Sequence, residues 1–150
     1  MNDMNDQFGL KRFVAAQDVG GTYDAAVAEL RAGRKRSHWM WFVFPQIAGL
    51  GQSTMSRRYA IRSLAEARAY LAHPVLGPRL IEASRAVKRV GGTAEAIFGG
   101  IDAIKLRSSM TLFARADPTN RAFQDVLDAY FGGVPDEATD SLLRGDEEPT

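Results

Sequence analysis

A group of polar side chains lies within an otherwise apolar segment near residue 105. Asp102, Lys105 and Ser109 are separated by three and four residues, so in a helix they form a polar stripe between two apolar faces. Ionised groups beside a core must be paired or must face a cavity. The pattern therefore predicts either a half-exposed ion pair between Asp102 and Lys105 or a cleft that binds a ligand. In the second arrangement Arg107 and Ser108 join Lys105 in the cleft.

Basic and aromatic residues are adjacent in residues 34–41, whose sequence is RKRSHWMW. Cations pair with phosphate and aromatic rings stack on bases, so this composition is typical of nucleotide binding. The alternative is a solvated basic loop that leads into two core tryptophans, Trp39 and Trp41. His38 is the better catalytic candidate of the two histidines because it lies in this segment, whereas His73 precedes a proline and is expected to be a turn residue.

Glycines and small hydroxyl residues are frequent in residues 45–59, whose sequence is PQIAGLGQSTMSRRY. Gly49 and Gly51 lack the preceding strand and the third glycine of a dinucleotide-binding fingerprint. A serine-rich loop before a helix can still bind phosphate through backbone N–H groups. The segment therefore indicates a phosphate contact rather than a dinucleotide site.

Length and composition exclude several classes of protein. With 150 residues, of which 45% are apolar, the chain can bury the core of one domain without disulfides or structural zinc. The absence of cysteine excludes thiolate catalysis, and with only two isolated histidines we expect no metal site and no cofactor. The longest apolar run, residues 39–44, is far shorter than the ~20 residues of a membrane helix, and the polar, acidic start is unlike a signal peptide. We therefore expect a soluble, cytoplasmic protein with no membrane partner.

The net charge of +1 conceals an uneven distribution of charge. Residues 1–30 carry two bases and five acids, residues 31–115 carry fifteen bases and four acids, and residues 116–150 carry two bases and nine acids. The corresponding charges are −3, +11 and −7. Fifteen of the nineteen bases are arginine, whose guanidinium suits bidentate contacts with phosphate. The middle segment therefore either neutralises the acidic ends within one fold or lines a cleft that receives an anion.

Helical periodicity dominates the chain and predicts a compact, single all-α domain of about seven helices over residues 8–143. Thr22 is expected to cap the second helix, Ser63 with Glu66 to form a capping box, and Asp117 to cap the helix near residue 120. Residues 1–7 are expected to be a flexible N-terminus and residues 144–150 a disordered acidic tail. The expected helices are 8–18, 23–32, 63–72, 74–90, 101–114, 117–131 and 136–143, with shorter turns at 38–44 and 93–98.

The helix over residues 101–114 is expected to lie in the middle of the domain. Ile101 and Ile104 fall with Leu112 on one side of the helical wheel, and Leu106, Met110 and Phe113 fall on the opposite side. A helix that is apolar on two sides is normally buried on both.

Several sequence strings together resemble the domain-of-unknown-function family 1810, some of whose members have been labelled calpastatin-like. The resemblance covers about residues 10–143, and the strings near residues 38–46 and 105–113 are the most specific. The matching strings are FVxAQ at 13–17, GRKxSHWMWFxFPQ at 33–46, GLGxS at 49–53, YAI at 59–61, ARxYL at 67–71, HPxLGxRL at 73–80, IFG at 97–99, KLxSSMTLF at 105–113 and FQ at 123–124.

The resemblance implies a fold and a class of ligand more than an activity. A calpastatin-like protein would be a flexible protease inhibitor, which the helical, core-forming sequence contradicts. The family is also grouped with the YbiA-like superfamily, whose better-known branch resembles N-glycosidases that act on ADP-ribose adducts and on ribosylamine phosphates. This kinship implies a compact helical domain with a cleft for a phosphorylated ribose.

One departure from that branch concerns the catalytic acid. The N-glycosidase branch has a Glu six residues before the Gln of the first helix, and Lys11 occupies that place before Gln17 here. A positive side chain cannot act as the carboxylate that glycoside cleavage uses. Either another acid has this role or the protein binds without cleaving. The candidate carboxylates in and beside the basic segment are Glu29, Glu66, Glu82, Glu95 and Asp102, of which only Asp102 lies in a family string.

These observations predict binding of a small anionic, nucleotide-like or ribose-phosphate ligand of the ADP-ribose type. If the protein is an enzyme, we expect a hydrolase of an N-glycosidic bond with Asp102 as its catalytic acid–base group. The alternative is a non-enzymatic binding module for nucleic acid or a protein partner, with the basic clusters Arg34–Arg36 and Arg57–Arg58 in an outward-facing patch. The residues expected to bind the small ligand are His38, Trp39, Trp41, Lys105, Arg107, Ser108 and Ser109.

Overall fold

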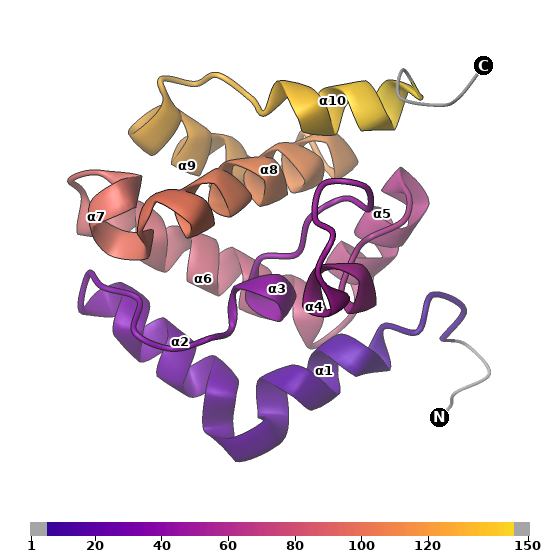
Figure 1. Ribbon diagram of the computed structural model, residues 1–150, viewed down its shortest axis with the longest axis horizontal. Coiled ribbons are helices and arrows are strands. Elements are labelled where there is room, and N and C mark those ends of the chain that lie inside the picture. The colour runs from indigo at the N-terminus through magenta and orange to yellow at the C-terminus, as the bar shows by residue number, and fades with distance from the viewer. Residues whose placement is uncertain (1–5, 146–150) are drawn as a thin grey trace.

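The computed structural model describes residues 6–145, and in this range it contains helices and no β-strand (Figure 1). Seven α-helices have at least eight residues, so the all-α prediction of about seven helices is confirmed. The predictions for residues 1–5 and 146–150 lie outside the described residues. The helices are α1 (Lys11–Asp18), α2 (Thr22–Arg31), α3 (Met40–Val43), α4 (Thr54–Arg58), α5 (Leu64–Ala72), α6 (Leu76–Val90), α7 (Ala94–Phe98), α8 (Gly100–Ala116), α9 (Arg121–Phe131) and α10 (Glu137–Arg144), with a 3₁₀ turn, η2 (Val19–Gly21), between α1 and α2.

Helix α8 is the centre of the fold. It packs against α5, α7, α9 and α10, while α6 packs against α2, α5 and α9. Figure 1 shows α1 and α2 as a V at the bottom of the view and α10 along the top. Gly20 and Gly21 form the corner of the V with φ of +62° and +69°, which L side chains rarely adopt. The chain therefore encloses α8 between its first and last helices.

The helix starts show where local sequence rules hold and where they do not. Ser63 caps α5 as predicted, because its Oγ accepts the N–H of Glu66 at 3.1 Å. The second bond of the predicted capping box differs, since the Glu66 carboxylate accepts the N–H of Arg62 at 3.1 Å and not that of Ser63. The prediction for Thr22 was wrong, since Thr22 is the first residue of α2 and makes no capping hydrogen bond. The prediction for Asp117 was also wrong: α9 begins at Arg121, and Asn120 is its cap.

His73 lies in the bend between α5 and α6, as expected of a turn residue, and its side chain also caps the start of α6. Its Nδ1 accepts the N–H groups of Val75 at 3.1 Å and Leu76 at 3.3 Å. A helix start leaves such N–H groups without partners inside the helix. The imidazole therefore does for α6 what a serine or asparagine does at other helix starts.

One hydrophobic core runs through the domain. Phe113 of α8 packs between Tyr70 and Phe123, with its ring centroid 5.3 Å from that of Tyr70 and 5.8 Å from that of Phe123. The prediction that α8 is buried on both sides holds for its second half but was wrong for its start, where Ile101 is 75% and Ile104 63% exposed. Their exposure opens a cleft beside the first turns of α8.

Candidate functional site

The cleft beside the start of α8, here called the Lys105 cleft, is bounded by three parts of the chain. They are the loop after α3, the first half of α8 and the start of α10. The cleft has a volume of about 270 Å³. Its lining residues are Gln46, Leu50, Ile101, Ile104, Lys105, Ser108, Asp136 and Ala138.

Two lysines share one carboxylate at the edge of this cleft. Asp102 Oδ2 lies 2.9 Å from Lys35 Nζ, and Asp102 Oδ1 lies 3.4 Å from Lys105 Nζ. The Lys105 ammonium also lies 5.3 Å from the centroid of the Trp41 ring, within cation–π range. Lys105 thus makes the predicted ion pair with Asp102 and also lines a cleft, whereas binding of a ligand there stays a prediction. The group carries two positive charges and one negative charge.

Glu29 holds the basic loop that delivers Lys35. Its Oε1 accepts the N–H of Arg36 at 2.8 Å and the indole N–H of Trp39 at 2.9 Å, and its Oε2 accepts the Ser37 hydroxyl at 2.6 Å. Burial opposes ionisation of this carboxyl, but hydrogen bonds from Ser37, Arg36 and Trp39 lower the pKa of Glu29 to about 2. A carboxylate of the chain itself therefore occupies the centre of the loop.

The aromatic and imidazole candidates of that loop lie in three different environments. Trp39 is fully buried against Phe44 and Phe98, so its ring is not at the surface. Trp41 is half-buried, and its ring lies against the Lys105 ammonium. His38 is exposed, and in the described part of the chain its side chain has no hydrogen bond or ion pair. Of these three side chains only Trp41 contacts Lys105, and none of the three lines the Lys105 cleft.

The remaining candidates on α8 separate in the same way. Ser108 Oγ lies in the Lys105 cleft, 3.2 Å from Asp136 Oδ2. Arg107 instead donates from Nε to the carbonyl of Val134 at 3.0 Å and does not line this cleft. Ser109 is fully buried, and within residues 6–145 its hydroxyl has no hydrogen-bond partner.

Ser109→Ala is expected to raise the free energy of unfolding by about 1 kcal/mol, because it removes a buried hydroxyl that lacks a partner. Urea denaturation followed by circular dichroism measures the change. Thr111→Val is the matched contrast: the Thr111 hydroxyl accepts the Asp136 N–H at 2.8 Å, so its removal should destabilise the protein. A loss of stability in Ser109→Ala would show that the hydroxyl is satisfied.

Sequence reasoning missed three groups that the fold brings to this region. Lys35 was one of three adjacent cations, and nothing in that run distinguished it. Gln46 belongs to one of the family strings, and no feature of the sequence marked it as a site residue. It lines the Lys105 cleft, and within the described range its side-chain amide makes no hydrogen bond. Asp136 was expected to begin the last helix, which it does while also contacting Ser108.

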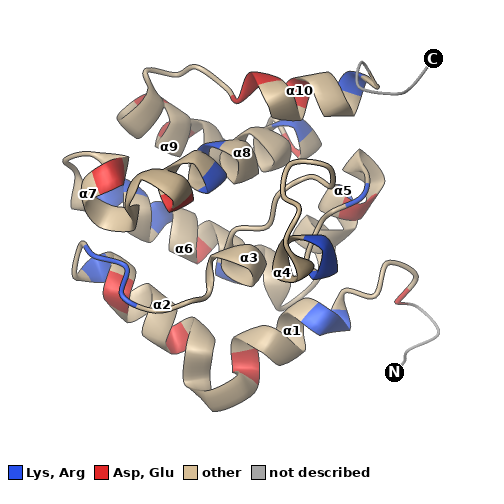
Figure 2. Cartoon of the chain, viewed as in Figure 1, with Lys and Arg blue, Asp and Glu red and all other residues tan. Residues whose placement is uncertain are grey.

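The cations of the middle segment are not gathered on one surface. Figure 2 shows acidic and basic residues on the same helices. Arg79 pairs with Asp18 at 2.9 Å, and Arg115 pairs with Asp140 at 2.9 Å, so bases of the middle segment contact acids of both ends. The neutralising alternative therefore accounts for part of the +11 charge.

Neither a membrane-spanning helix nor a metal-binding cluster is found within residues 6–145. No helix there has both the length and the apolar character to cross a membrane. No group of three or more His, Asp or Glu side chains there is arranged to hold a metal ion.

The chain is similar to known proteins in sequence and in structure. A family model described as protein of unknown function (DUF1810) matches residues 7–143. The chain is also similar to the crystal structure of the conserved hypothetical protein Rv1873 from Mycobacterium tuberculosis, with 56% identity and a TM-score of 0.88. The similarity covers 91% of this chain and 97% of the other. No curated protein matches the chain.

Proposed function

The chain belongs to the DUF1810 family, whose function is unknown, and we propose that its Lys105 cleft binds a small anionic, nucleotide-like ligand of the ADP-ribose type. The observation that carries this proposal is the position of the Lys105 ammonium, which lies in a cleft and over the half-buried Trp41 ring. A cation beside an aromatic ring suits a ligand that has both a phosphate and a flat base.

The ion pairs indicate which lysine is available to the phosphate. Lys35 is nearly buried and lies closer to Asp102, at 2.9 Å, while Lys105 lies at 3.4 Å and is more exposed. A phosphate can therefore draw Lys105 away while Lys35 still neutralises Asp102. The cation and the incoming anion would then form a charge-assisted hydrogen bond.

The apolar wall of the cleft supports a ligand with a ring. Ile101 and Ile104 are both mostly exposed. Exposed patches of large apolar side chains mark binding sites. At about 270 Å³ the cleft is close to the lower end of the range for small-molecule sites, ~300–1,000 Å³. This size suits a ribose phosphate or one half of a dinucleotide better than a larger ligand.

The resemblance to the YbiA-like superfamily supports the same ligand class and extends the proposal to catalysis. Asp102 is the carboxylate nearest to Lys105. If N-glycosidic cleavage follows binding, Asp102 is the group that would stabilise the developing positive charge on the ribose or activate water. We also place the protein in the cytoplasm, where such phosphorylated ligands are found.

Isothermal titration calorimetry with ADP-ribose, NAD and ribose 5-phosphate tests the proposal. Lys105→Ala should weaken binding of ADP-ribose about tenfold, because it removes one charge-assisted contact. Lys88→Ala is the matched control, since Lys88 is exposed on α6 and contacts Asp125 at 3.9 Å. Chromatography of the titrated samples detects a released base, which Asp102→Asn should abolish.

Several outcomes would contradict the proposal. No heat with any of the three ligands at millimolar concentration would reject nucleotide binding, and equal losses in Lys105→Ala and Lys88→Ala would reject the role of Lys105. Salt-steep binding of a short single strand that is unchanged in Lys105→Ala would favour the nucleic-acid alternative.

A further inference from the structure

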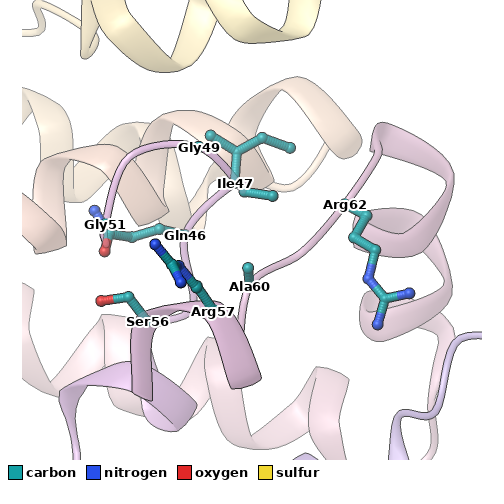
Figure 3. A pocket seen from close by; sticks show the side chains of 9 residues that line it. Gln46, Ile47, Gly49, Gly51, Ser56, Arg57, Ala60 and Arg62 are labelled. Carbon is teal, nitrogen blue, oxygen red and sulfur yellow. The ribbon is translucent and has the colours of Figure 1, made fainter. Parts of the chain in front are cut away.

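A second cavity lies next to the Lys105 cleft and shares one wall with it. Here called the arginine cavity, it has a volume of about 200 Å³. Its lining residues are Gln46, Ile47, Ala48, Gly49, Gly51, Ser56, Arg57, Ala60 and Arg62 (Figure 3). Gln46 also lines the Lys105 cleft, so the two hollows are neighbours at this residue.

The charge of the arginine cavity is uncompensated. Two arginines line it, and no aspartate or glutamate does. Within the described residues the Arg57 guanidinium hydrogen-bonds only to the Gln52 side chain, at 3.2 Å. The Arg62 guanidinium has no hydrogen-bond partner there and points away from Arg57, Gln46 and Ser56 (Figure 3). By contrast, Arg12, Arg79 and Arg115 each pair with a carboxylate. A hollow that holds cations without acids raises the local concentration of anions.

The walls of the cavity are held in place before any ligand binds. The Ile61 N–H donates to the Gln46 carbonyl at 2.9 Å, and the Ala48 N–H donates to the Ile61 carbonyl at 2.7 Å. Gly51 lies so close to Ser56 that a Cβ at this position would be 2.4 Å from the Ser56 Oγ. Only glycine fits there without a shift of Ser56. A preformed site loses less conformational entropy when it binds.

We propose that the arginine cavity binds a phosphate group through Arg57, with the Gln46 amide and the Ser56 hydroxyl, which lie beside the Arg57 guanidinium, as further hydrogen-bond donors (Figure 3). Since Gln46 lines both hollows, one ligand can extend from the Lys105 cleft into the arginine cavity. That ligand carries phosphate at a distance from its ring, as a nucleoside diphosphate derivative does. This extension to a single ligand rests on the proposed function, whereas phosphate binding by the cavity does not.

Titration of pyrophosphate into the protein tests the phosphate site directly. Arg57→Gln should weaken pyrophosphate binding about tenfold, whereas Arg58→Gln should change it less than twofold. Arg58 is the matched control because it adjoins Arg57 on α4 and does not line the cavity. Thermal unfolding of each variant within about 2 °C of wild type shows that the fold is intact.

Titration of ADP-ribose into the same variants separates this inference from the proposed function. If both hold, Lys105→Ala and Arg57→Gln each weaken ADP-ribose binding about tenfold. Loss in Lys105→Ala alone overturns the shared ligand and leaves the proposed function standing. Pyrophosphate binding that needs Arg57, without any ADP-ribose binding, keeps the phosphate site and overturns the proposed function. No pyrophosphate binding, or equal loss in Arg58→Gln, overturns the phosphate site.

Discussion

Glu66→Ala is expected to lower the free energy of unfolding by about 3 kcal/mol, because it breaks a buried ion pair and leaves one partner uncompensated. Glu66 is 1% exposed, and its Oε2 lies 3.0 Å from Arg12 Nη2. Its Oε1 accepts the N–H of Arg62 at 3.1 Å. One side chain thus neutralises a charge on α1 and satisfies the backbone just before α5.

Arg12 determines how large this effect becomes. Its guanidinium also donates to the carbonyls of Arg58 and Ala60, both at 2.8 Å, and so joins α1 to the segment before α5. These bonds persist without Glu66, and the Arg12 side chain is 18% exposed to solvent. Both features hold the expected loss below the ~5 kcal/mol found for the most buried pairs.

Urea denaturation at pH 7, followed by circular dichroism, measures the change in Glu66→Ala. Glu66→Gln keeps an acceptor and loses the charge, so its stability should lie between wild type and Glu66→Ala. Glu95→Ala is the control, since Glu95 is an exposed acid near the start of α7. If Glu66→Ala were as stable as Glu95→Ala, the ion pair would contribute nothing measurable.

Glu29→Gln is expected to lower the free energy of unfolding by up to about 2 kcal/mol at neutral pH, after allowance for solvent screening of this partly exposed group. The folded pKa of Glu29 is about 2, below its ordinary value of 4.5. The contribution of Glu29 is therefore complete above about pH 4.5 and disappears as the pH falls towards 2. The difference between wild type and Glu29→Gln should shrink over the same interval.

Denaturation curves for both proteins between pH 7 and about pH 2.5 measure this pH dependence. Asp24→Asn is the control, because Asp24 is an exposed acid on the same helix. Glu29→Gln should also weaken ADP-ribose binding, since Glu29 holds the loop that places Lys35 beside Asp102. A difference that stays constant across this pH range would rule out Glu29 as its source.

The sequence by itself determined the helical character of the chain and several helix ends. The helix predicted over residues 74–90 forms over residues 76–90, because Leu80 and Val87 are buried at helical spacing. Ser63 caps α5 because its hydrogen bond with the Glu66 N–H spans only three residues. The polar stripe of α8 could be predicted for the same reason. Each of these features depends on residues within a turn or two of one another along the chain.

Only the tertiary structure decided which side chains meet at the candidate site. Lys35 and Asp102 are far apart in sequence and meet because the Lys35 N–H donates to the carbonyl of Ile97, just before α8. The composition of the basic loop did not show that Trp39 would be buried with its indole hydrogen-bonded to Glu29 while Trp41 lies against Lys105. Helical periodicity specifies which residues share a face of a helix, whereas packing between distant elements specifies which faces are covered.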